Sequence, residues 1–242
     1  MTAARATRSL IGPAIVAACA FAFLVSLGVW QLQRKQWKEG LIETLAQRTT
    51  ARPIELPAPS TWTGLMPDAD EYRRVRLRGQ FIENAKAAFL YTAGSSLRDD
   101  VKAPGYFVFA PMRLPDGRIV AVNRGYAAQA EAQPVRGSVE IVGYLRFPES
   151  GSMFVSDHDA SATTWFVRDP QAMARALGWG EVAPFYIDQE SPVPAGGSPK
   201  PGPLTVKLRN DHLGYALTWF GLAAGLVAVF GVWAAAQRRK KA

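Results

Sequence analysis

The sequence predicts an α+β membrane protein in which two transmembrane helices, one near each end, flank a single antiparallel, β-rich, barrel-like domain. Two uncharged apolar runs, at residues 10–30 and 213–236 of 242, predict the helices. Each is long enough to cross a hydrocarbon core of about 30 Å. Between them, short segments of alternating apolar and polar residues are separated by Pro- and Gly-containing turns, which is typical of β-structure. We therefore expect one domain outside the bilayer, with one or two helices of its own.

The domain boundaries follow from the apolar runs. In chain order we expect a cytoplasmic N-terminus (1–9), a first transmembrane helix (10–32), the β-rich domain (33–209), a second transmembrane helix (210–236) and a basic cytoplasmic tail (237–242). The first run is too long for the core of a signal peptide, so we interpret it as an uncleaved anchor. Its helical pattern continues past the membrane to about residue 48.

Charge predicts the orientation. The chain has a net charge of +8, and a basic cluster, Arg238–Lys241 in one-letter code RRKK, follows the second apolar run. Such clusters stay in the cytoplasm, which leaves the β-rich domain on the other side of the membrane and the helices in contact with lipid. No basic run with interleaved aromatic residues predicts a nucleic-acid site. The only cysteine, Cys19, excludes an internal disulfide and a Cys-x-x-Cys redox site.

Alternation and turn residues place the elements of the domain. Strands are expected at residues 72–81, 87–91, 105–114, 118–122, 140–147, 164–168 and 184–188. A helix is expected from Pro170 to about Leu177, because Asp169 is a good N-cap and Gly178 a good stop. Residues 53–67 are expected to be a Pro-rich connector. Asn123, Arg124 and Gly125 are expected to form the turn that closes a hairpin, and the alternative is that Arg124 faces a partner or a propionate.

The start of the second apolar run carries the candidate binding residues. Asn210 and Asp211 suit an N-cap, so His212 falls in the first helical turn, where the helix dipole disfavours a positive ring. Tyr215 and Trp219 follow at three and seven residues, on the same helix face. A neutral imidazole beside two large aromatic rings could hold a flat, metal-bearing ligand such as haem. The alternative is an interfacial aromatic belt with a structural histidine.

Two further patterns give weaker hypotheses. Asp157, His158 and Asp159 are the one cluster suited to acid–base or metal chemistry, and the competing interpretation is a solvated turn. Small residues recur every four positions in both apolar runs, at Ala14, Ala18, Ala22 and Ser26 and at Gly221 and Gly225. This spacing lets helix backbones approach closely, so the two spans are expected to pack along these stripes.

An ordered set of motifs resembles the Surfeit locus protein 1 family, membrane factors for the assembly of cytochrome c oxidase. The motifs are, in chain order, Gly28-Val29-Trp30-Gln31-Leu32, Glu71-Tyr72-Arg73-Arg74-Val75, Gly79-Gln80-Phe81, Gly105-Tyr106, Val122-Asn123-Arg124-Gly125-Tyr126, Pro184-Phe185-Tyr186-Ile187-Asp188 and the segment from Arg209 to Trp219. They cover almost the whole chain. Tyr126 is a departure, because Trp or Phe is expected there.

The resemblance implies a role in which haem a is delivered to, or retained in, subunit I of the oxidase. It implies His212 as the haem contact. Our own hypothesis is that His212 ligates or abuts the haem iron and that Tyr215 and Trp219 wall the macrocycle. Arg209 and Lys207 are the cations closest in sequence that could meet the propionates. Haem a would be held transiently, and haem a synthase is a further candidate partner. No catalytic residue is expected. The short N-terminus favours a bacterial inner-membrane protein with a periplasmic domain. The alternative is a cofactor-free scaffold that stabilises an oxidase assembly intermediate.

Overall fold

The computed structural model describes residues 10–149, 164–205 and 210–239. The chain divides into two compact units. One comprises Met1–Glu43 and Leu208–Ala242, and the other comprises Thr44–Lys207. The first unit is helical and the second contains every described strand.

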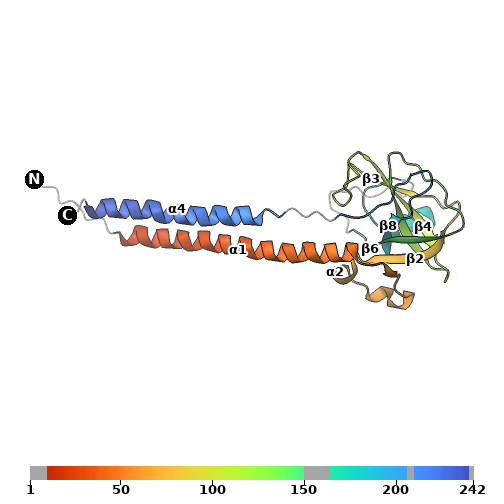
Figure 1. The fold of residues 1–242 in the computed structure, drawn as a ribbon, viewed down its shortest axis with the longest axis horizontal. Helices are drawn as coiled ribbons and strands as arrows, with labels where there is room; N and C mark the ends of the chain where they lie inside the picture. Colours follow the sequence, from red (N-terminus) through yellow and green to blue (C-terminus); the bar gives the residue numbers. More distant parts are fainter. Residues whose placement is uncertain (1–9, 150–163, 206–209, 240–242) are drawn as a thin grey trace, which may run out of the picture. The chain divides into compact units, whose positions relative to one another are not determined.

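Two long helices make up the first unit and are the α1 and α4 of Figure 1. Helix α1 spans Ile11–Thr50, and its last turns belong to the second unit; helix α4 spans His212–Arg239. Both are long and apolar enough to cross a membrane, with mean hydropathy of 2.2 and 1.9 in their most apolar windows. Only 6% of each window is buried inside the protein, so most of these side chains have no protein covering. The prediction of two long apolar helices is confirmed.

The contacts between these helices differ from the predicted stripes. Gly28 of α1 lies so close to the ring of Phe220 that a Cβ atom at position 28 would collide with it. Ala216 and Ala223 are the buried residues of α4. By contrast, a Cβ atom on Gly221 or Gly225 would meet nothing within 4 Å. Ala18, Ala22 and Ser26 are exposed as well. The small-residue stripes are therefore a wrong prediction, and the helices meet along another face.

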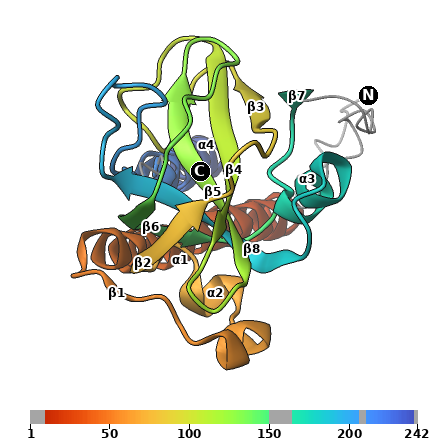
Figure 2. The same ribbon diagram turned by 90° about the vertical axis from the view of Figure 1, so that its right-hand side faces the viewer.

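The second unit is a closed five-stranded barrel with extra strands at its margins (Figure 2). The barrel order is β2 (Arg74–Phe81), β6 (Ser138–Arg146), β8 (Val182–Ser191), β5 (Ile119–Ala127) and β4 (Gly105–Arg113), closed by pairing of β4 with β2. The marginal strands are β1 (Ile54–Glu55), β3 (Ala88–Thr92) and β7 (Thr164–Trp165). The barrel-like domain is thus confirmed. Its sheet is mixed rather than wholly antiparallel, because β5 and β8 run parallel.

Short helices complete this unit. Helix α3, Pro170–Leu177, has the predicted bounds: Asp169 accepts a hydrogen bond from the backbone N–H of Ala172 at 2.9 Å, and Gly178 adopts a left-handed φ of 69°. The expected Pro-rich connector instead forms a 3₁₀ helix, η1 (Pro59–Gly64), and one turn of helix, α2 (Pro67–Asp70). Trp62 of η1 packs edge-on against Phe185 of β8, with 5.1 Å between ring centroids.

Strand β5 corrects the hairpin prediction. It continues to Ala127, so Asn123, Arg124 and Gly125 lie within a strand and not in a turn. The glycine is still needed: its φ is 114°, and a Cβ atom there would collide with the backbone of Lys200. Tyr126 pairs with Lys200 through backbone hydrogen bonds in both directions. The turn-forming residues therefore mark a place where a second segment of backbone crosses close to the barrel.

Alternation in β2 gives the barrel its inner face. Val75, Leu77 and Phe81 are buried, whereas the arginines between them are partly or fully exposed. The inner residues join one apolar cluster with Met112, Leu145 and Phe185, among others. A second cluster, which includes Phe109, Trp165, Met173 and Trp179, lies where α3 packs against the sheet. Strand β2 pairs with β4 and with β6, so it is not an edge strand of the barrel.

Candidate functional site

His212 begins helix α4 and contacts α1 through its imidazole. Its Nδ1 lies 2.8 Å from Oε1 of Gln31, a residue 181 positions earlier in the chain. Both residues belong to the helical unit and both are half-buried. The hydrogen bond therefore connects the two apolar helices through polar atoms.

This hydrogen bond sets the chemistry of the imidazole. An amide oxygen can only accept, so Nδ1 of His212 carries the proton and donates to Gln31. Of the two neutral forms of the ring, this contact selects the one whose lone pair lies on Nε2. No described residue bonds to that nitrogen. His212 thus presents the form of imidazole that binds a metal ion or accepts a proton.

The two predicted aromatic walls lie on the same helix as His212 but differ in their surroundings. Tyr215 is 57% exposed, whereas Trp219 is half-buried. No ring contact joins Tyr215 to Trp219 in the described part of α4. The exposed ring of Tyr215 is therefore the more accessible of the two for a flat ligand.

The remaining predicted residues of this site lie outside the described residues. These are Arg209 and Lys207, and the same holds for the cluster of Asp157, His158 and Asp159. Within the described ranges, no group of three or more His, Cys, Asp or Glu residues is placed to hold a metal ion. A structural zinc ion takes four protein ligands, but haem iron needs only an axial ligand from the protein. A lone histidine with a free Nε2 suits the second case.

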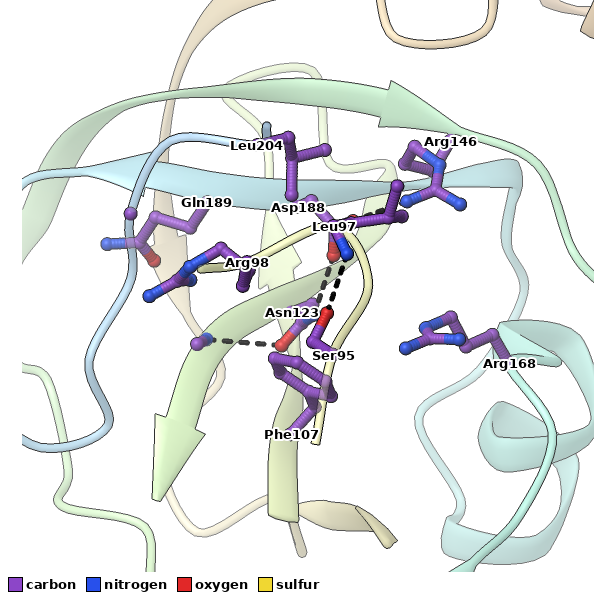
Figure 3. Close-up of a pocket in the computed structure, with 12 residues that line it drawn as sticks. Ser95, Leu97, Arg98, Phe107, Asn123, Arg146, Arg168, Asp188, Gln189 and Leu204 are labelled. Carbon is purple, nitrogen blue, oxygen red and sulfur yellow. Dashed lines mark hydrogen bonds and ion pairs between the residues drawn. The ribbon is translucent and has the colours of Figure 1, made fainter. Parts of the chain in front are cut away.

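A second polar cluster lies on the face of β5, β6 and β8 that points away from the apolar interior of the barrel, and the sequence did not predict it. Asp188 accepts hydrogen bonds from Nδ2 of Asn123 at 2.6 Å and from Nη1 of Arg146 at 2.9 Å. Arg146 also donates to Glu71 at 3.0 Å. Figure 3 shows Asn123 and Asp188 near the centre of this cluster, with Arg98 and Arg168 on opposite sides. Three motifs distant in sequence therefore meet through charged groups.

The cluster leaves little room for a ligand. The cavity beside it measures about 20 Å³, close to the space that one water molecule needs. The arginines that line it are already paired: Arg98 with Asp100, Arg146 with Asp188 and Arg168 with Glu149. We conclude that this cluster stabilises the barrel.

Burial shifts the pKa of two buried groups of the barrel. Complete burial, with the nearby charge of Asp188, raises the pKa of the Tyr186 hydroxyl well above its ordinary value. Desolvation lowers the pKa of Arg124, whose Nη1 donates to the carbonyl of Gln133 at 2.7 Å. Arg124 also stacks over Phe81, with 5.1 Å from Cζ to the ring centroid. The predicted turn is wrong for Arg124, because this residue lies within β5 with its side chain buried, and its contact with a partner or a propionate stays a prediction.

Sequence reasoning found His212 but not its partner. Gln31 stands in the quoted motif after the first apolar run, where we assigned it no role. The signal available was a polar amide between apolar residues, one helical turn after Gly28. Asp188 and Asn123 also stood in quoted motifs. Only the pairing of β5 with β8, which sets Asn123 opposite Asp188, reveals their contact.

Comparisons with known proteins agree with this architecture. A model described as the SURF1 family matches residues 18–224. Surfeit locus protein 1 of Takifugu rubripes is 33% identical over 216 residues, which cover 82% of this chain and 87% of the relative. The proteins of the same name from Mus musculus and Homo sapiens are 35% and 33% identical, each across 82% of this chain and 68% and 69% of their own lengths.

Proposed function

Since this chain belongs to the SURF1 family, whose members are known as cytochrome c oxidase assembly factors, we propose that it aids delivery of haem a to subunit I of the oxidase, or its retention there. Family members are generally assembly factors and not enzymes, and we assign no catalytic residue. The single observation that supports a haem role is the geometry of His212, with Nδ1 bonded to Gln31 and Nε2 free. One such nitrogen can serve as an axial ligand.

The surrounding residues suit a transient cofactor. Tyr215 and Trp219 offer apolar surface for the macrocycle, and Arg209 and Lys207 precede His212 closely enough in sequence to be candidates for the propionates. Cation–carboxylate hydrogen bonds are among the stronger ones in proteins. If haem binds, His212 would be its one proposed iron ligand from this chain, and binding through a single side chain would suit transfer to an acceptor better than permanent storage.

The proposed setting is the inner membrane of a bacterium, with the barrel in the periplasm. Arg238 and Arg239 lie in the last turn of α4, and cationic residues at the end of a span favour the cytoplasmic side. Two spans place both termini on that side. Subunit I is the proposed partner, haem a synthase a further one, and lipid contacts the helices.

The test of the haem role compares two histidine variants of the full-length protein. Wild type, His212→Ala and His158→Ala are purified in detergent from cells that make haem a, and haem per protein is measured by absorption. We expect His212→Ala to carry several-fold less haem, with His158→Ala unchanged, because an axial ligand has no substitute on this helix face. Equal haem in all three proteins would remove His212 from the proposal. The unfolding transition of the barrel serves as the folding control.

A cofactor-free scaffold is the second candidate, and one observation favours it. Tyr91 and Phe166 are 42% and 58% exposed, with 6.1 Å between their ring centroids. Exposed aromatic patches often mark sites of interaction with other proteins. A scaffold predicts that a Tyr91→Ser, Phe166→Ser variant loses copurification of the oxidase intermediate. It also predicts that His212→Ala keeps both this complex and normal oxidase maturation. The haem proposal predicts impaired maturation for His212→Ala.

A further inference from the structure

The contact between Gln31 and His212 has properties that a mere helix anchor does not require. Many groups could hold two helices together, but a glutamine oxygen at 2.8 Å selects one of the two neutral forms of the ring. Lys or Arg at this position would donate instead of accepting, and Leu would select neither form. The identity of residue 31 therefore controls which nitrogen of His212 is free.

Metal-binding histidines commonly have this arrangement. The nitrogen that does not face the metal donates its N–H to an acceptor, which fixes the tautomer and the orientation of the ring and makes the ligand more basic. In His212 the donating nitrogen is Nδ1, the acceptor is Gln31, and Nε2 is left for the metal. The acceptor comes from a different helix, so ring orientation depends on the pairing of α1 with α4.

Gly28 supports the same pairing. It lies three residues before Gln31, and its missing side chain makes room for the ring of Phe220 on α4. Gly28 and Gln31 are therefore one helical turn apart on one face of α1. The two contacts restrict how α4 can slide along α1. The register that brings Oε1 of Gln31 to Nδ1 is thus defined by packing as well as by the hydrogen bond.

We propose that Gln31 is a positioning residue that holds His212 in the Nδ1–H form and so presents Nε2 as the axial ligand for haem iron. The ligand part of this statement rests on the proposed function. The tautomer part is a property of the apoprotein and is tested without haem.

The first measurement is ¹⁵N NMR of histidine-labelled, full-length apoprotein in detergent, at a pH of about 8.5, where an ordinary imidazole is neutral. His212→Ala assigns the signals of the ring. Wild type should show a protonated Nδ1 and an unprotonated Nε2. Gln31→Leu should lose this preference, and Gln31→Glu, whose carboxylate also accepts, should keep it. Gln33→Leu is the matched control, because Gln33 is exposed on the same helix.

The second measurement is titration of the same proteins with haem, followed by absorption. Loss of such a supporting hydrogen bond typically weakens metal binding by about 10-fold or more. We expect that loss in Gln31→Leu, with Gln31→Glu and Gln33→Leu near wild type. If the wild-type ring is protonated on Nε2, the inference is overturned whatever the haem result. It is also overturned if Gln31→Leu keeps the Nδ1–H tautomer expected for wild type. Equal haem affinity in Gln31→Leu and wild type overturns the positioning role. Wild type that binds no haem overturns the proposed function, while the NMR result still decides the hydrogen bond.

Discussion

The barrel and the helical unit place charged or titratable side chains in opposite situations. In the barrel, Asp188 is 7% exposed and uses both carboxylate oxygens on neighbours, one on Asn123 and one on Arg146. At the head of α4, His212 uses one nitrogen on Gln31, and no residue in the described part of the chain bonds to the other. This difference separates motif residues whose polar atoms all bond within the protein from those that keep a polar atom available for a ligand. We expect changes in the barrel to affect stability, and changes around His212 to affect binding.

The largest expected effect comes from Asp188→Ala. It leaves Arg146 buried without its main carboxylate partner, and loss of one member of a buried pair costs about 3–5 kcal/mol. Chemical unfolding of the purified protein, followed by tryptophan fluorescence, measures this loss. Glu55→Ala is the control, since that side chain is 80% exposed and lies 3.9 Å from Arg76. If Asp188→Ala unfolds like wild type and loses haem instead, the barrel cluster is a binding site and the contrast is broken.

A smaller loss is expected from Gly125→Ala. Its φ of 114° strains any other residue, and a Cβ atom there also collides with the backbone of Lys200. Gly137→Ala is the matched control: its φ is 77°, but the space around it is open. We expect Gly125→Ala to lose on the order of 2 kcal/mol more than Gly137→Ala in the same unfolding experiment. Equal losses would mean that the crossing of Lys200 over β5 adjusts freely.

Two glycines in the helical unit should respond with opposite signs. Gly28→Ala forces the ring of Phe220 to move and should destabilise the helix pair by about 1 kcal/mol. Gly221→Ala meets no neighbouring atom, so the gain in helix propensity should stabilise α4 by about 0.5–1 kcal/mol. Thermal loss of helical circular dichroism in detergent measures both. If Gly221→Ala destabilises the helix pair instead, the result would support packing along the small-residue stripe, which the structure contradicts.

The smallest effect concerns acid pH. A hydrogen bond from Arg98, with support from Lys200, holds the pKa of Asp100 well below its ordinary value. Stability from this carboxylate is therefore complete above the unfolded pKa of about 4 and is lost as pH falls towards the folded pKa. Asp100→Asn should show a shallower loss of stability than wild type between pH of about 5 and about 3, by less than about 1 kcal/mol. Asp68→Asn, at an exposed site, should follow wild type.

Local patterns predicted most of the fold. The length of the uncharged runs predicted both apolar helices, and the Asp169 and Gly178 caps predicted α3. Alternation predicted the strands β2 to β8 to within a few residues, except for the later end of β5. Patterns failed where residues serve contacts between distant segments. Gly125 is a typical turn residue, but here it lies in a strand and makes room for the backbone of Lys200. The connector before β2 is ordered because Trp62 packs against Phe185. The small-residue stripes failed because Ala and Gly occur on several faces of each span.

The candidate site divides in the same way. Helical periodicity sufficed to put His212, Tyr215 and Trp219 on one helix, and the comparisons do not test their roles. The acceptor for His212 was not predictable, since Gln31 belongs to the other end of the chain and no local spacing relates the two. The same holds for Asp188 and Asn123, which are 65 residues apart.

The separation of Gln31 from His212 has a consequence for biosynthesis. Gln31 leaves the ribosome early, and the last barrel strand, β8, is complete at Ser191, before His212 has been translated. Domains generally fold as units in the order of their synthesis. The barrel can therefore fold before the hydrogen bond between Gln31 and His212 forms. A chain cut off before its final helix would carry the complete barrel but would lack His212, so only the full-length product could present this imidazole to haem.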